Sequence, residues 1–405
     1  MTSPVRVRKG SIRKGYPIGE DHEKHKQNNE SINAMNSTTS PIKIGVITDI
    51  TGPLSLLGVA NANIAKLAID EMNAHGGLLD RPLLLHLEDS ATTDSVAGAK
   101  ARKLIQEDRV DALLGGIYSS TRQAIKGPVV EGKKLYIYPE QYEGQECHPL
   151  IFCTGPVPAQ QVESMIPWLM EKTGAKKFYC PSADYIWPHI LNKKLREVVA
   201  AHGGSIVGEE YFSMDHTDYA ATVQKIASSG AEVVFNTIVP PGVGPFLEQL
   251  HKSGFTKRGG QLVCTYFEEN LLNLFPPEQV DGMYSCLDYY QSVNDPFSRD
   301  LLGRYDKLYP GSSKFTGGSA ATGLYRGLKL WEAAVKEAGS LDQDAVIRAL
   351  DHAKIAQGPG GPAEMVPGQH HLRLNMYIGH ANNGKFEVAK DLGVIDPKEC
   401  TQGLR

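Results

Sequence analysis

The stretches LLGGIYSSTR at residues 113–122 and LYIYPEQYEGQEC at residues 135–147 decide the fold. Each begins with a short apolar run, continues into a polar loop, and leads into a helical or turn pattern. Apolar runs bounded in this way predict buried strands of a parallel α/β sheet. In such a sheet the loops at the carboxyl ends of the strands converge on one crevice, where ligands bind. We therefore expect both loops to border a ligand-binding crevice.

The polar side chains of these loops are candidate ligand contacts. Tyr118 and Ser119 stand where a helix begins, and hydroxyls and free backbone N–H groups at such a point can hold a small polar group. Tyr138 and Glu140 follow the second apolar run. A serine at a strand–helix junction is also a common helix cap, so these hydroxyls alone do not identify a ligand.

The alternation of strand and helix extends along most of the chain and predicts two doubly wound lobes. The expected strands are residues 43–47, 83–87, 113–115, 177–180, 205–211, 233–236 and 261–265. The expected helices are residues 58–73, 94–107, 159–173, 219–228, 244–253 and 319–338. Near the end of the chain, Asn382-Asn383-Gly384 predicts a β-hairpin turn.

Three crossings between the lobes are expected, near residues 156, 288 and 360. The first and third fall in Pro- and Gly-rich segments. The predicted division is residues 41–156 with 289–360 for lobe 1, and residues 157–288 with 361–405 for lobe 2. Each lobe is expected to have its own sheet, and three crossings form a hinge suited to closure over a ligand. Residues 1–40 are polar without an apolar period, which predicts a disordered arm.

The phrase YPEQYEGQE at residues 138–146 carries a resemblance to a known family. Four further stretches match in order: residues 44–58, 184–188, 236–239 and 358–388 with His370-His371. Over about residues 41–390 the chain resembles the type I periplasmic-binding-protein family. Within it, the chain is similar to the branch of urea-type ABC-transporter binding proteins and cytoplasmic amide receptors. The resemblance implies two Rossmann-like lobes joined by a three-strand hinge.

The resemblance also implies which residues face the cleft between the lobes. They are Tyr118, Ser119, Tyr138, Glu140, Tyr185, Trp187, Thr237 and Glu268. Aromatic side chains at a cleft would enclose a small flat ligand, although Trp187 can equally be a packing residue before Pro188. Glu140 departs from the family's amino-acid receptors, which have a neutral residue there. An ionised Glu140 outside a salt bridge would repel a carboxylate and favour urea, a short amide or an amidine-like cation.

An enzyme is not expected, because no GxSxG, HExxH or P-loop pattern occurs. Glu268, Glu269 and Asp288 are carboxylates that could act in acid–base catalysis. We interpret them instead as a ligand contact and a solvated charge. His370 and His371 would point to opposite sides of a strand, so a shared metal ion is not expected. No cofactor is expected either.

Charge, hydropathy and cysteine content narrow the partners and the compartment. The net charge of −4 gives no reason to expect nucleic acid, and no apolar run is long enough to span a membrane. The six cysteines show no CxxC pattern, which argues against a zinc site. All six are interpreted as unpaired, favouring a reducing compartment. Four of them are expected to be buried: Cys153, Cys180, Cys264 and Cys286.

The expected function is that of a substrate-binding protein of an ABC-type uptake system. It would capture a small amide-, urea- or amino-acid-like solute by hinge closure and deliver it to a permease outside the cytoplasm. The alternative is a cytoplasmic amide sensor of an amidase-type operon, with a regulatory protein as partner. Residues 1–40 lack the apolar segment of a secretory signal, which favours the cytoplasm; the resemblance favours a periplasmic or other extracytoplasmic location.

Overall fold

Strand β1 (Ile42–Thr48) is an interior strand of the first half of the sheet, and its residues contribute to apolar clusters on both faces. Ile44 and Val46 pack with helix α2 (Ser55–Ala74), whereas Ile47 packs with residues of α3 (Asp94–Arg102) and α4 (Ser119–Glu131).

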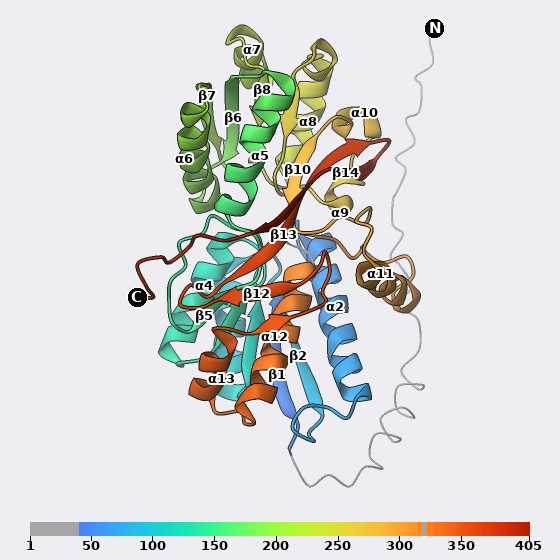
Figure 1. The fold of residues 1–405 in the computed structure, drawn as a ribbon. Helices are drawn as coiled ribbons and strands as arrows, with labels where there is room; N and C mark the ends of the chain where they lie inside the picture. The colour runs from blue at the N-terminus through green and yellow to red at the C-terminus, as the bar shows by residue number, and fades with distance from the viewer. Residues whose placement is uncertain (1–39, 318–320) are drawn as a thin grey trace, which may run out of the picture. The chain divides into compact units, whose positions relative to one another are not determined.

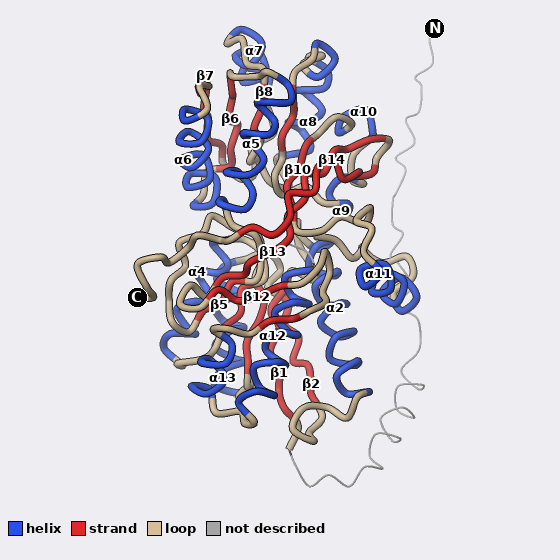
Figure 2. Tube along the Cα trace, in the orientation of Figure 1, coloured by secondary structure: helices blue, strands red, loops and turns tan. Residues whose placement is uncertain are grey.

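The computed structural model describes residues 40–317 and 321–405, and the predicted disordered arm falls outside them except for Ser40. Residues 41–405 form one unit, drawn in Figures 1 and 2.

The first half-sheet consists of five parallel strands in the order β2-β1-β3-β4-β5. Their bounds are Leu83–Asp89 (β2), Ala112–Gly115 (β3), Tyr136–Tyr138 (β4) and Ile151–Cys153 (β5). A π-helical segment, η1 (Lys103–Asp108), extends α3. Both stretches singled out in the sequence form a strand followed by a loop, as predicted.

The second half-sheet has the order β10-β9-β8-β6-β7, again parallel. Its strands are β6 (Lys177–Ala183), β7 (Ser205–Phe212), β8 (Val233–Phe235), β9 (Gln261–Val263) and β10 (Tyr284–Leu287). Its helices are α5 (Pro158–Thr173), α6 (Ile186–Ala201), α7 (Ala220–Ser228), α8 (Val243–Lys252), the 3-10 turn η2 (Thr256–Arg258), α9 (Glu269–Leu272) and α10 (Pro277–Val280). The predicted alternation of strand and helix is confirmed in this half.

The chain after β10 supplies α11 (Pro296–Leu308), α12 (Thr322–Ala338), α13 (Gln343–Leu350) and four strands. These strands are β11 (Lys354–Ile355), β12 (Ala363–Val366), β13 (His371–Asn382) and β14 (Lys385–Ile395). Helix α12 packs beside α2 over the first half-sheet (Figure 1). The predicted start of this helix at residue 319 lies outside the described residues. The hairpin predicted at Asn382-Asn383-Gly384 joins β13 to β14.

Strand β13 connects the two half-sheets, and the expectation of two separate sheets is therefore wrong. Its first residue, His371, pairs in parallel with Cys153 of β5. Six residues later it pairs antiparallel with β10, from Tyr377 with Leu287 to His380 with Tyr284. The lobe boundaries remain a prediction, but this pairing favours a third crossing within β13 rather than at residue 360.

A disulfide joins Cys147 to Cys400, with 5.6 Å between the Cα atoms. The expectation that all six cysteines are unpaired is therefore wrong; the bond spans 253 residues, and sequence spacing gives no sign of it. The other four cysteines are free and buried, as predicted. Around the disulfide, the Arg405 N–H donates to the Cys147 carbonyl at 2.8 Å, and the Gln145 N–H donates to Glu399 at 2.8 Å. The end of the chain is thus fastened to the loop that begins at Glu140.

Replacing both cysteines, in Cys147→Ser with Cys400→Ser, should lower the free energy of unfolding by about 2–5 kcal/mol, because the unfolded chain loses a long covalent loop. Urea unfolding without reductant would measure this. Adding dithiothreitol should lower the wild-type midpoint to that of the double variant and leave the variant unchanged. Equal midpoints for the two proteins without reductant would contradict the assignment of this bond.

Candidate ligand-binding site

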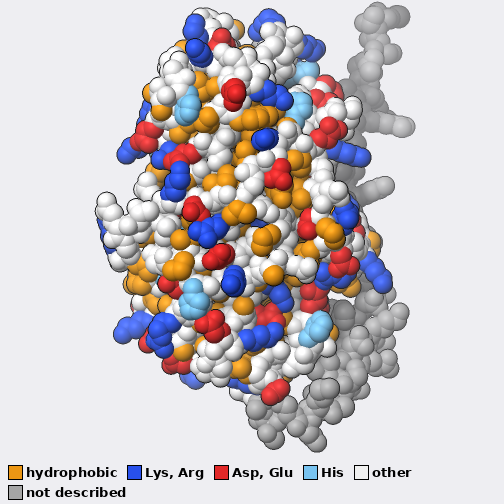
Figure 3. Space-filling model, in the orientation of Figure 1, with side chains coloured by type: hydrophobic (Ala, Val, Ile, Leu, Met, Phe, Trp, Pro, Cys, Tyr) orange, Lys and Arg blue, Asp and Glu red, His pale blue; other side chains and the backbone are white. Residues whose placement is uncertain are grey.

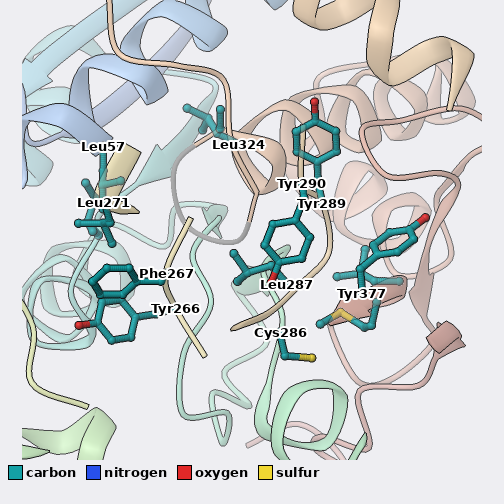
Figure 4. Packing of buried hydrophobic residues seen from close by; sticks show 14 of the residues in the cluster. Leu57, Tyr266, Phe267, Leu271, Cys286, Leu287, Tyr289, Tyr290, Leu324 and Tyr377 are labelled. Carbon is teal, nitrogen blue, oxygen red and sulfur yellow. The ribbon is translucent and has the colours of Figure 1, made fainter. Parts of the chain in front are cut away.

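A cavity of about 40 Å³ lies where the carboxyl ends of the two half-sheets face each other. Its walls are mostly apolar and aromatic, which is typical of small-molecule sites. Twelve residues line it: Leu54, Leu57, Ile117, Tyr118, Ser119, Gln141, Tyr185, Trp187, Val239, Pro240, Tyr266 and Leu271. Figure 4 shows three of them, Leu57, Tyr266 and Leu271, among the buried apolar groups; Phe267, next to Tyr266, does not line the cavity.

Aromatic side chains from both halves meet across this cavity. The Tyr118 hydroxyl donates to the Pro240 carbonyl at 2.8 Å, and the Tyr118 ring meets the Tyr185 ring edge-on with centroids 5.7 Å apart. Tyr185 caps α6, whose first turn carries Trp187. The Trp187 ring packs edge-on against Tyr266 at 5.6 Å. The two halves therefore touch directly through groups that also line the cavity.

Ser119, the first residue of α4, connects the cavity wall to a buried ion pair. Its hydroxyl donates to Oε2 of Glu143, and Oε1 of Glu143 accepts from Nη2 of Arg122 at 2.7 Å. The Arg122 guanidinium lies over the rings of Tyr138 and Tyr142, 5.0 and 4.6 Å from their centroids. All of these side chains are buried. The YEG part of the motif thus supports the wall at Ser119.

Glu140 is fully buried just behind the cavity wall, next to the lining residue Gln141. One carboxyl oxygen accepts from the Asn61 amide at 3.0 Å, and the other has no hydrogen-bond partner among the described residues. A Cβ atom at Gly155 would lie 2.2 Å from the Glu140 carbonyl, so only glycine allows the backbone at residue 155 to pass this close.

Several carboxylates share the surroundings of Glu140. Burial raises the pKa of Glu140 well above its usual range; the hydrogen bond from Asn61 opposes this, and the charges of Asp49, Asp288 and Glu268 add to it. None of the twelve residues that line the cavity is Lys or Arg. The electrostatic potential behind the wall is therefore unfavourable to a further negative charge.

Glu268 and Glu269 lie at the start of α9. Glu268 accepts from the backbone N–H groups of Asn270 at 2.9 Å and Leu271 at 2.8 Å. Burial raises the pKa of Glu268 to about 7 and that of Glu269 to about 8. Asp288 is buried as well and pairs with Arg326. The expectation of a solvated charge among Glu268, Glu269 and Asp288 is wrong, because all three are buried.

Four of the eight predicted site residues line the cavity: Tyr118, Ser119, Tyr185 and Trp187. The other four do not. Tyr138 points into the core and donates its hydroxyl to the Ile117 carbonyl at 2.7 Å, and Glu268 caps a helix. Glu140 lies behind the wall, and Thr237 is buried with no partner for its hydroxyl among the described residues. That any of the eight contacts a ligand remains a prediction.

The sequence analysis missed eight lining residues. Five of them belong to stretches that were singled out in the sequence, namely Leu54, Leu57, Ile117, Gln141 and Val239, and Pro240 follows directly after one of these stretches. Tyr266 stands just beyond a predicted strand, where the rule for carboxyl ends of strands would have included it. Four of the eight are apolar residues that no sequence signal separates from core residues: Leu54, Leu57, Ile117 and Leu271.

Within residues 40–317 and 321–405, no group of three or more His, Cys, Asp or Glu could hold a metal ion. His370 stacks on Phe152 with centroids 3.7 Å apart, and His371 stacks on Tyr142 at 5.9 Å.

Among the described residues, 40–317 and 321–405, no helix has the length and apolar character of a membrane span. On the face shown in Figure 3, basic and acidic side chains are interspersed.

A family model described as periplasmic binding protein matches residues 41–385, and the chain belongs to that family. A curated relative, Leu/Ile/Val-binding protein homolog 8 of Brucella suis biovar 1 (strain 1330), is 24% identical over 350 residues, covering 81% of this chain and 84% of the relative. The predicted type I periplasmic binding protein fold is confirmed.

Solved structures show the same fold. The amino acid ABC transporter substrate-binding protein of Pseudomonas fluorescens Pf-5 has a TM-score of 0.80 at 18% identity, covering 91% of this chain and 99% of that chain. An ABC transporter solute-binding protein of R. palustris in complex with benzoate has a TM-score of 0.77 at 19% identity, covering 89% and 98%. The branched-chain amino acid binding protein of Streptococcus pneumoniae in complex with isoleucine has a TM-score of 0.76 at 21% identity, covering 88% and 100%.

Glu269 should make the protein less stable as the pH rises. Because its pKa is raised from 4.5 to about 8, the folded state holds this proton more tightly than the unfolded state. The resulting stability is present below about pH 4.5 and is lost as the pH rises through about 8. Relative to wild type, Glu269→Gln should therefore gain stability between pH 5 and pH 9, on the order of a few kcal/mol.

Urea unfolding at both pH values would measure this gain. The exposed carboxylate Glu278 provides the control, since Glu278→Gln should show the same pH dependence as wild type. If Glu269→Gln shows the same pH dependence of the free energy of unfolding as wild type, ionisation of Glu269 does not destabilise the folded state.

Proposed function

We propose that this chain is the substrate-binding protein of an ABC-type uptake system and captures a small amide- or urea-like solute, or a related amino-acid-like one, by closure of two lobes. The observation that carries this proposal is the cavity between the half-sheets, walled by Tyr118 from one half and by Tyr185 and Trp187 from the other. The relatives described above are named as binding proteins, which supports a receptor rather than an enzyme.

The charge near the cavity supports a ligand rich in N–H donors. Benzoate and isoleucine, the ligands named for two of the solved structures, both carry a carboxylate. In this chain a carboxylate would meet neither Lys nor Arg among the lining residues and would lie near Glu140. An unpaired charge in such a place costs several kcal/mol. An amide or urea carries no charge, and its donors and acceptors can hydrogen-bond to the unpartnered oxygen of Glu140 whether that carboxyl group is ionised or neutral.

Closure follows from unequal affinity for the open and closed states. The ligand first binds the loops that carry Ser119 and Glu140, and contacts to Tyr185 and Trp187 then form only in the closed state. A ligand that gains these contacts shifts the equilibrium toward closure, whereas equal affinity for both states would shift nothing. The bond from Tyr118 to the Pro240 carbonyl adds a direct contact between the halves.

An extracytoplasmic location fits this role, with an ABC permease as partner. The Cys147–Cys400 disulfide supports it, because such bonds persist in oxidising compartments and are rare in the cytosol. The alternative is a cytoplasmic amide-sensing receptor that passes closure to a regulatory protein. Fractionation of the native host separates the two, since recovery in the cytosol alone would favour the sensor.

Urea or propionamide should raise the melting temperature of the purified protein, because a ligand that binds only the folded state stabilises it. Small-angle scattering of the same samples should show a smaller radius of gyration at saturation. Ammonia release would be followed in parallel as a control for turnover. If benzoate or isoleucine stabilises the protein and neither amide does, the proposed ligand class is wrong; if dimensions stay constant at saturation, closure is wrong.

Replacing Glu140 by threonine should weaken binding of propionamide by about tenfold, because a buried polar group of the ligand that is left without its hydrogen-bond partner costs roughly 1–3 kcal/mol. Isothermal titration calorimetry would give the dissociation constants. Glu107→Thr, at an exposed carboxylate of η1, provides the matched control and should bind as the wild type does. Equal affinity of Glu140→Thr and wild type would show that Glu140 does not contact the ligand.

A further inference from the structure

The Ser119 hydroxyl donates its hydrogen bond to a partner that does not line the cavity. Ser119 lines the cavity, yet its Oγ atom hydrogen-bonds to Oε2 of Glu143, which does not line it. Both residues are almost completely buried, with 3% and 2% of their surfaces exposed. This bond is therefore shielded from water, which could otherwise exchange for either partner.

The donor in this bond is set by Arg122. The guanidinium donates to the other oxygen of Glu143 at 2.7 Å and lies 3.6 Å from Glu146. A carboxylate that faces a guanidinium only accepts hydrogen bonds, so the shared proton belongs to Ser119. A serine hydroxyl has one proton and two lone pairs. Because the Ser119 hydroxyl donates its proton to the hydrogen bond with Glu143, only the lone pairs of its oxygen are left for a group in the cavity.

The backbone beside Ser119 has the opposite polarity. The first turn of α4 begins at Ser119, and the first N–H groups of a helix have no acceptor within it. Donor N–H groups and the acceptor oxygen of Ser119 therefore lie close together at the start of α4. A carboxamide carries a carbonyl oxygen and an NH2 group in the same arrangement, whereas a carboxylate has two acceptor oxygens. One carboxylate oxygen would face the lone pairs of Ser119.

We propose that Glu143, held by Arg122, is a positioning residue that orients the Ser119 hydroxyl away from the cavity and thereby selects a carboxamide over the isosteric carboxylate. This inference rests on the proposed function, since it assumes that amide- or urea-like solutes occupy the cavity. It adds a determinant of specificity that does not touch the ligand.

The isosteric change Glu143→Gln should reverse the polarity of Ser119. The carbonyl oxygen of the new side chain can accept from Arg122, and its NH2 group then donates to the Ser119 oxygen. The serine proton is released toward the cavity, where it can bind an acceptor. Arg122 also lies 3.6 Å from the Glu146 carboxylate, so in Glu143→Gln the buried guanidinium still has one carboxylate close by.

The test compares propionamide with propionate, which have nearly the same shape, by isothermal titration calorimetry. Wild type should bind propionamide at least about tenfold more tightly, and Glu143→Gln should reduce this ratio by about tenfold. Ser119→Ala should reduce the ratio too, and adding Glu143→Gln to it should cause no further change. Ser120→Ala is the matched control: its hydroxyl donates to Asp94 at 3.1 Å and does not line the cavity, so the wild-type ratio should persist.

The outcomes separate this inference from the function on which it rests. A wild-type protein that binds neither compound, or prefers propionate, overturns the proposed ligand class and the role of Glu143 with it. A wild-type preference for propionamide that survives in Glu143→Gln overturns the role of Glu143 alone. If Glu143→Gln does not fold, Ser119→Ala decides: an unchanged ratio in that variant overturns the inference.

Discussion

The pairing of β13 with both half-sheets is the constraint on which the rest of the structure depends. His371 is bonded in register with β5, and Tyr377 to His380 are bonded in register with β10. One strand of twelve residues therefore brings the ends of two parallel half-sheets face to face. Because the loops at these ends carry the polar and aromatic side chains, the cavity lies where it does as a result of this strand.

The charged groups of the core divide into those with partners and those without. Arg122 pairs with Glu143, and Arg326 pairs with Asp288, so that these ions are compensated where they are buried. One oxygen of Glu140 and one of Glu269 have no partner among the described residues. Unsatisfied buried carboxyl groups reduce stability and are uncommon in structural cores. Buried carboxyl groups with raised pKa values are more frequent at functional sites than in structural cores.

The fold could be predicted from the sequence because its elements are local. Apolar runs and helical periods follow from neighbouring residues, and the motif around Tyr138 and Glu143 marks the family. The site could be predicted only in part. Tyr118 and Ser119 follow a strand directly, whereas Leu57 and Leu271 reach the cavity through packing between distant helices. The direction of Tyr138 depends on the core around it, and the partner of Cys147 is 253 residues away, so neither is encoded in spacing.

The disulfide has a topological consequence, because it closes a covalent ring. The ring runs from Cys147 to Cys400 and contains the entire second half-sheet together with β13 and β14. A protease that cuts any exposed loop in this ring opens it without releasing a fragment. The two pieces stay joined, and the hydrogen bonds of β13 still hold their registers. A molecule that is cut once in this ring thus keeps both walls of its cavity in one covalently joined unit.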